Sequence, residues 1–168
     1  MKKTLLSLIL ALSFIAVSFA QTSTLRDPGY KGSISLMYQG LACVGLETSH
    51  GAMLNQHHYL GVGAGAFVFP DGKSYPSFVE GFLDYQAYIL KKNSTPVLGL
   101  KTGYIRALTK DNTNFTQGLS LQPEVGWSWA FNPKYGLTIS AGANLVFPME
   151  KYNKVLYALP RAAITFEF

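Results

Sequence analysis

An alternation of apolar and polar residues runs through most of the chain with a period of two. It is clearest from Leu119 to Trp129, where one face is apolar: Leu119, Leu121, Pro123, Val125, Trp127 and Trp129. The opposite face is polar or small: Ser120, Gln122, Glu124, Gly126 and Ser128. Successive side chains of a strand point to opposite sides, so this period predicts a strand with two unlike faces. No long segment after residue 21 has the 3.6-residue period of a helix, and we therefore expect an all-β fold.

Segments of this kind recur along the chain and are separated by turn residues such as Pro70-Asp71-Gly72 and Asn132-Pro133-Lys134. We predict eight strands: 30–39, 41–49, 58–69, 77–90, 97–108, 119–131, 136–147 and 156–168. A tilted strand that crosses a membrane needs about 9–11 residues, and each segment is long enough. Their regular spacing predicts a closed, up-and-down antiparallel barrel of eight strands.

The direction in which each face points decides the environment of the barrel. A soluble barrel or sandwich buries its apolar face, whereas a membrane barrel turns that face to lipid and keeps a polar interior. Charged residues make up only 14% of the chain, and the polar faces are rich in Gly, Ser, Thr, Gln and Asn. Small residues suit the crowded interior of a narrow barrel better than a solvated surface. The sequence favours a transmembrane barrel over a soluble exported one.

The N-terminal residues have the layout of a secretory signal peptide. Lys2 and Lys3 precede an uncharged apolar run, and Ser18-Phe19-Ala20 offers small residues for cleavage before Gln21. A membrane-anchoring helix is the alternative, but the run is short for a span of about 20 residues. We expect residues 1–20 to be a cleaved signal peptide and residues 21–168 to form a single barrel domain.

Aromatic residues gather near the strand ends on the apolar faces, as in the interfacial girdles of membrane barrels. The members are Tyr30, Tyr38, Tyr104, Trp129, Phe131, Phe166 and Phe168. With its export signal, its eight alternating segments and the terminal Phe168, the chain resembles small bacterial outer-membrane β-barrels. More narrowly, Thr48-Ser49-His50-Gly51, taken as a turn, and the strand at 60–65 resemble the small Bacteroidetes-type outer-membrane β-barrel family.

The resemblance implies a fold and a location. It implies insertion into outer-membrane lipid and recognition of the last strand, which ends in Phe168, by the barrel assembly machinery. Many relatives would have an aromatic residue after Ser-His-Gly, where this chain has Ala52. The family supplies no agreed activity that could be transferred to this chain.

Charged residues fall on the polar faces, which would line the interior. On this register the interior network is Lys31, Glu47, Glu80, Asp84, Lys101, Glu124, Arg161 and Glu167. Charges removed from bulk water must be paired or hydrogen-bonded. The interior of an eight-stranded barrel is nearly filled by side chains. We interpret these residues as a plug of ion pairs, with a narrow ion path as the alternative.

An even number of up-and-down strands returns the chain to the side on which it began, so we expect both termini in the periplasm. The extracellular connections are then short, and three of their aromatic residues are candidates for contacts with a ligand, a lipid headgroup or another protein: Tyr75, Phe115 and Tyr152. Plain interfacial anchoring is the alternative explanation for these three side chains.

Other chemistry finds little support in the sequence. His57 and His58 are adjacent in an extended chain and point apart, so no metal site is expected. Glu47, Ser49 and His50 lie along one strand and cannot converge as a catalytic triad. Without Lys2 and Lys3 the net charge falls from +5 to +3, and no large basic cluster points to nucleic acid. The one cysteine, Cys43, excludes an intramolecular disulfide.

These observations predict a non-enzymatic integral outer-membrane protein without a cofactor, with a structural or surface-interaction role. Two alternatives remain. One is the binding of a lipid or small hydrophobic ligand at the barrel mouth. The other, less favoured, is an enzyme that modifies lipid A.

Overall fold

The computed structural model describes residues 26–40, 43–69, 77–108, 117–149 and 156–168. These residues form eight strands and no helix. The strands are β1 Gly29–Gln39, β2 Cys43–Met53, β3 His58–Val68, β4 Phe78–Tyr88, β5 Ser94–Ala107, β6 Gln117–Ala130, β7 Gly136–Pro148 and β8 Tyr157–Glu167. In these described ranges, no helix could cross a membrane.

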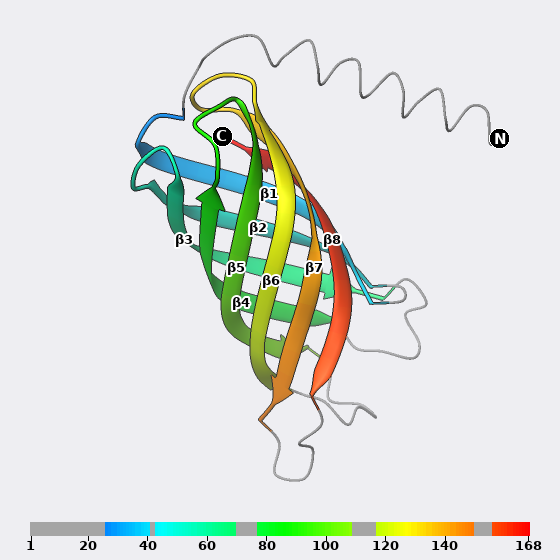
Figure 1. The fold of residues 1–168 in the computed structure, drawn as a ribbon. Helices are drawn as coiled ribbons and strands as arrows, with labels where there is room; N and C mark the ends of the chain where they lie inside the picture. Colours follow the sequence, from blue (N-terminus) through cyan, green and yellow to red (C-terminus); the bar gives the residue numbers. More distant parts are fainter. Residues whose placement is uncertain (1–25, 41–42, 70–76, 109–116, 150–155) are drawn as a thin grey trace, which may run out of the picture.

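Each strand pairs with its neighbours in sequence, and β8 pairs with β1 to close the barrel (Figure 1). All eight pairings are antiparallel. The predicted closed eight-stranded antiparallel barrel is therefore confirmed. The described chain begins and ends at the same end of the barrel. This end also holds the connections 54–57, 89–93 and 131–135, and we call it the turn end. The opposite end is the loop end.

The closing pair is held in register by the last residue. β1 and β8 pair from Ser33↔Glu167 to Gln39↔Arg161. Beyond this ladder, Gly32 N donates to Phe168 O at 2.6 Å, and Phe168 N donates to Gly32 O at 2.9 Å. A Cβ at Gly32 would lie 2.5 Å from the Phe168 ring, so the absence of a side chain there lets the ring lie over β1.

Two predicted boundaries were wrong. The sequence predicts a turn at residues 48–51, but β2 continues through them to Met53. Gly51 pairs with Gly61 of β3, and the two backbones approach closely at this point. A glycine is therefore needed at position 51 for strand packing and not for a turn. Residues 94–96 fall in the connection between the predicted strands 77–90 and 97–108, but they begin β5. Thr95 is fully buried, and its hydroxyl accepts a hydrogen bond from Leu90 N at 2.8 Å.

The close approach at Gly51 makes a testable prediction. A Cβ at this position would collide with the backbone of β3 at Leu60 and Gly61, and backbone cannot rotate aside as a side chain can. We expect Gly51→Ala to lower the free energy of unfolding by about 1–3 kcal/mol, the usual cost of overpacking. Gly81→Ala is the control, since a Cβ at Gly81 meets nothing within 4 Å. Urea titration of the refolded protein measures both changes, and equal stability of the two variants would contradict the prediction.

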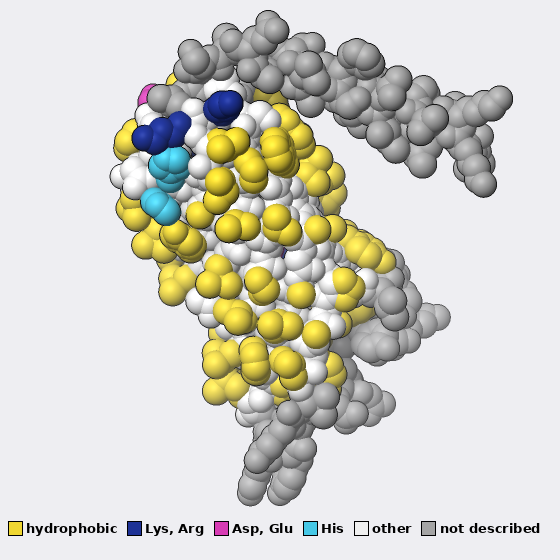
Figure 2. All heavy atoms as spheres, in the orientation of Figure 1, with side chains coloured by type: hydrophobic (Ala, Val, Ile, Leu, Met, Phe, Trp, Pro, Cys, Tyr) yellow, Lys and Arg dark blue, Asp and Glu magenta, His cyan; other side chains and the backbone are white. Residues whose placement is uncertain are grey.

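The outer surface of the barrel is apolar on every strand. Large apolar side chains with about half of their surface exposed occur from Ile34 on β1 to Phe166 on β8. Figure 2 shows hydrophobic side chains spread along the whole visible wall, while Lys, Arg and His lie at the turn end. Arg106 is the one Asp, Glu, Lys or Arg that points outward from the described strands. This distribution is the reverse of that in a soluble barrel.

Candidate functional site

The charged side chains of the interior are the candidate site. The structure places all eight predicted residues inside the barrel, where seven are buried and Glu124 is nearly so. They come from strands on all sides of the lumen and form two groups joined by polar side chains. We call the group around Arg161 the middle network and the group around Glu167 the turn-end network.

The middle network is centred on the guanidinium group of Arg161 on β8. Its Nη2 lies 2.7 Å from Glu47 Oε2 on β2, and its Nε lies 3.1 Å from Glu124 Oε1 on β6. Lys101 on β5 also contacts both carboxylates, with its Nζ 2.6 Å from Glu47 Oε2 and 3.7 Å from Glu124 Oε1. Two cations and two anions thus alternate across the lumen and tie four strands together.

Glu80 on β4 joins this network through neutral groups. Arg161 Nη1 donates to Gln122 Oε1, and Gln122 Nε2 donates in turn to Glu80 Oε1 at 2.7 Å. Ser120 also donates to Glu80 Oε1. Among the described residues no cation forms an ion pair with Glu80. Gln122 therefore links Arg161 to the Glu80 carboxyl group, with which Arg161 forms no ion pair.

The turn-end network surrounds Glu167, one residue before the end of the chain. Its Oε2 lies 3.0 Å from Lys31 Nζ and 3.6 Å from Arg26 Nη2. Its Oε1 accepts a hydrogen bond from Thr138 at 2.6 Å. Both cations also lie over the ring of Tyr88, at 4.4 Å for Lys31 and 4.2 Å for Arg26. The carboxylate of Glu167 thus forms two ion pairs and is buried from solvent at the turn end.

Arg26 is a member of this network that sequence reasoning missed. It precedes β1, so the alternation that assigned inward and outward positions does not reach it. Its side chain is nonetheless buried, and its Nη2 donates to Ser128 Oγ at 2.5 Å. The sequence held one indication of a further interior cation, because the predicted interior has three cations for five anions. With Arg26 the described interior has four cations for five anions.

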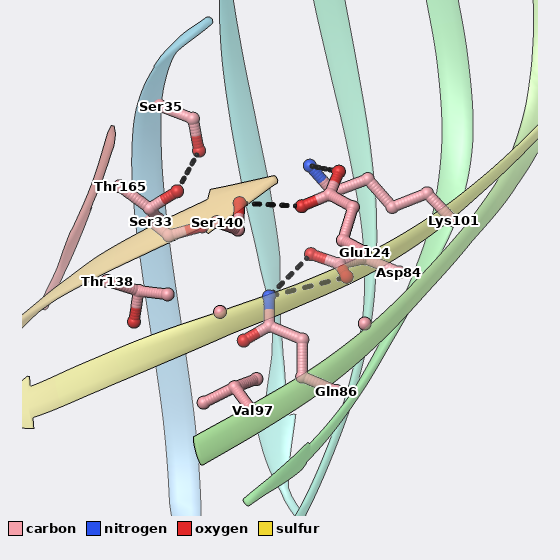
Figure 3. Close-up of a pocket in the computed structure, with 12 residues that line it drawn as sticks. Ser33, Ser35, Asp84, Gln86, Val97, Lys101, Glu124, Thr138, Ser140 and Thr165 are labelled. Carbon is pink, nitrogen blue, oxygen red and sulfur yellow. Dashed lines mark hydrogen bonds and ion pairs between the residues drawn. The ribbon is translucent and has the colours of Figure 1, made fainter. Parts of the chain in front are cut away.

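Between the two networks lies a small polar cavity (Figure 3). The Gln86 amide points to the Asp84 carboxylate, with Nε2 3.1 Å from Oδ2, and Ser140 donates to Glu124 at 2.9 Å. Ser35 and Thr165 hydrogen-bond to each other across the β1–β8 closure at 2.8 Å. The cavity has room for about one water molecule. It is too small for a lipid or a sugar.

Apolar layers occupy both ends of the lumen, and the polar faces of the sequence do not predict them. The layer at the loop end consists of Met37, Cys43, Phe67, Ile105, Val146 and Ala163, with the half-buried Phe69, Phe78 and Tyr157 against it. The layer at the turn end consists of Met53, Tyr59, Tyr88 and Val97. These residues sit on inward positions near strand ends. These layers interrupt the polar pattern of the inward faces, although Lys31 and Glu167 still place charged groups at the turn end.

The histidines do not converge on one point. His50 Nδ1 hydrogen-bonds to Tyr30 OH at 2.7 Å on the outer wall, whereas Glu47 and Ser49 point inward from the same strand. His57 Nδ1 contacts Tyr88 O at 2.7 Å, and His58 Nδ1 contacts Tyr85 OH at 2.8 Å. Within the described ranges, no three His, Cys, Asp or Glu side chains are grouped to hold a metal ion.

The loop candidates Tyr75, Phe115 and Tyr152 lie outside the described residues. The girdle candidates on the described strands are better placed. Tyr30, Tyr38, Tyr104, Phe131 and Phe166 are all exposed, and Trp129 and Phe168 are half-buried. At the turn end, ring stacking connects Tyr135, Phe166 and Phe168 around the closing strand.

Comparison with known proteins supports the fold. No protein-family model and no curated protein matches the chain. The crystal structure of the N-terminal β-barrel domain of Pseudomonas aeruginosa OprF is similar, with a TM-score of 0.59 and 13% identity. The similarity covers 84% of this chain and 100% of that domain.

Two further structures are similar. For neisserial surface protein A (NspA) the TM-score is 0.59 at 15% identity, covering 83% of this chain and 95% of that one. For a de novo designed transmembrane β-barrel it is 0.50 at 16% identity, covering 86% of this chain and 98% of that one. At these identities the likeness concerns the fold alone, and the narrower Bacteroidetes-type resemblance is not confirmed.

Proposed function

We propose that this chain is an integral outer-membrane β-barrel protein with a plugged interior and a non-enzymatic, structural or surface-interaction role. One observation carries the proposal. The side chains that point outward from the described strands are almost all apolar, while nine charged side chains are drawn into the lumen. An apolar wall of this extent is costly in water and stabilising in lipid.

The outer membrane is the favoured location because residues 1–20 are predicted to be an export signal and the described residues form a barrel with an apolar wall. Resemblance to known outer-membrane barrels supports the same location. In this proposal both termini and the turn end face the periplasm, and the loop end faces outward. The barrel assembly machinery would recognise β8 with its terminal Phe168 before the strand closes on β1.

Three layers support a plugged interior. The apolar layer at the loop end, the middle network and the turn-end network follow one another along the lumen. The cavity between the networks has room for about one water molecule. An ion on this path would have to separate buried ion pairs and then cross an apolar layer.

The proposal is tested on the mature protein from a membrane fraction. We expect the unheated protein to migrate differently from the boiled protein in SDS gels, as closed membrane barrels often do. We also expect conductance near zero in planar bilayers. Loss of the mobility shift with recovery in the soluble periplasmic fraction would refute membrane insertion. Sizeable open-channel currents would refute the plug alone.

A second candidate function, binding of a small hydrophobic ligand at the loop end, is favoured by one feature. Phe69, Phe78 and Tyr157 lie half-buried above an apolar layer at that mouth, and the rings of Phe69 and Phe78 meet edge to face at 6.3 Å. Such a surface would accept an acyl chain more readily than a polar solute. Mass spectrometry of the purified protein in mild detergent would detect a retained lipid, and its absence would disfavour this candidate.

A further inference from the structure

The three connections at the turn end form one continuous rim. Tyr88 N at the end of β4 donates to His57 O in the first connection at 2.7 Å. Ala130 N at the end of β6 donates to Asn93 O in the second connection at 2.7 Å. The connections 54–57, 89–93 and 131–135 are thus hydrogen-bonded through the strand ends between them. We call these residues the basic rim.

The charges of the basic rim have one sign. Its residues include the exposed Lys91, Lys92 and Lys134 and no Asp or Glu. Among the described residues, none of these lysines forms an ion pair. Figure 2 shows Lys, Arg and His side chains gathered at this end, with little Asp or Glu beside them. One described carboxylate lies close to the rim, because Asp27 lines a small pocket together with Lys134. Lys91 and Lys92, which do not line that pocket, carry the positive potential on which the inference rests.

Exposed apolar side chains stand beside these lysines. Leu54 is 61% exposed, Ile89 48% and Leu90 41%, although each lies in a short polar turn. Lysine next to exposed leucine or isoleucine is typical of chain that lies at a membrane surface, with apolar groups in the acyl boundary and ammonium groups among the headgroups. In water the same three side chains would be exposed without compensation.

The lysines are held on fixed turns. Ile89 N donates to Pro96 O at 3.0 Å on one side of Lys91 and Lys92, and the Asn93 side chain is buried on the other. In the third connection the Asn132 side-chain oxygen accepts from Lys134 N at 2.9 Å and from Tyr135 N at 2.8 Å. Rigid turns reduce the ordering cost of binding, because the backbone beneath each ammonium group is already in place.

We propose that the basic rim binds the phosphate groups of anionic phospholipids in the leaflet that surrounds the turn end. This inference rests on the proposed membrane insertion. The ammonium groups of Lys91 and Lys92 supply the recognition, and Leu54, Ile89 and Leu90 keep the rim at headgroup depth. A zwitterionic lipid offers the same phosphate with a neighbouring cation, so it binds more weakly. Each lysine near an anionic surface strengthens binding about fivefold at low salt.

The test uses the full mature barrel, folded in a non-ionic detergent, and native mass spectrometry at low salt. The probes are phosphatidylglycerol and phosphatidylcholine with identical acyl chains. We expect phosphatidylglycerol to bind more tightly. Lys91→Gln and Lys92→Gln should each weaken its binding about fivefold, and the double variant more than tenfold. Arg106→Gln is the matched control, because it removes one positive charge from the outer wall near the loop end and should change binding less than twofold.

Several outcomes would overturn the proposal. Unchanged binding in the double variant would do so, as would an equal loss in Arg106→Gln, which would indicate a response to total charge. Excess inorganic phosphate that displaces the lipid completely would assign the site to free phosphate. Each variant must first show the heat-dependent mobility shift. Loss of that shift in the unsubstituted protein would refute membrane insertion, whereas a retained shift with unchanged lipid binding refutes the rim alone.

Discussion

Arg161→Ala is expected to lower the free energy of unfolding by about 3–5 kcal/mol, the range for removing one partner from a buried ion pair. The guanidinium group contacts Glu47 at 2.7 Å and Glu124 at 3.1 Å and donates to Gln122. Its removal leaves Lys101 as the one remaining cation of the middle network for two buried carboxylates. The loss of the guanidinium group also leaves Gln122 without its cationic partner.

Urea unfolding of the barrel refolded into lipid vesicles measures this change. Arg106→Ala is the control, since Arg106 has the same side chain on the outer wall and makes no ion pair with any described residue. We expect the control to change stability by less than about 1 kcal/mol. Equal losses in the two variants would mean that the middle network contributes nothing specific.

A double variant identifies the cause of the loss. If the excess carboxylate charge is the source, Arg161→Ala combined with Glu124→Gln should recover part of the stability, because Lys101 then balances the one remaining partner, Glu47, at 2.6 Å. A purely additive double variant would contradict this explanation. Conductance of Arg161→Ala should stay near zero, since the apolar layer at the loop end is unchanged.

The largest effect on the outer wall is expected from Leu83→Arg. Leu83 lies in the middle of β4 and is 55% exposed. On a soluble protein an exposed position of this kind accepts arginine at little cost. At the midplane of a bilayer the same change costs about 2–4 kcal/mol. The substitution therefore distinguishes water from lipid as the surroundings of this wall.

Ile89→Arg is the matched control, because it makes a comparable change just beyond the end of the same strand. Ile89 lies one residue beyond the end of β4, is 48% exposed and belongs to the basic rim. Near the interface the cost of arginine falls to about 0–1 kcal/mol. Unfolding in lipid vesicles should separate the two variants clearly, and a similar small effect at both positions would indicate that the wall is not in lipid.

The fold could be predicted because its signal is strong and local. Residues 119–129 alternate without a break, and every strand of the closed barrel contains a similar stretch. The errors came from residues whose role is set by a neighbour across the sheet. Gly51 and Pro96 look like turn residues, but Gly51 lies against the backbone of β3 and Pro96 pairs with Trp127.

The sequence predicts only part of the candidate site. Period two tells which side chains share a face, so the inward positions of Glu47, Lys101 and Arg161 could be read from it. It does not tell which of them meet across the lumen, because that depends on the stagger of the strands around the barrel. Arg26 lies outside any strand, and the apolar layers at the ends of the lumen break the polar pattern, so neither could be predicted.

The most direct test of membrane insertion uses the two tryptophans of the chain. Trp127 and Trp129 occupy outward positions on β6, and Trp127 is 43% exposed. Fluorescence of the unmodified mature protein in vesicles of acyl-brominated phospholipid should be strongly quenched, while aqueous iodide should have little effect. Tryptophans that resist the brominated lipid and respond to iodide would contradict the account, because the apolar wall would then face water.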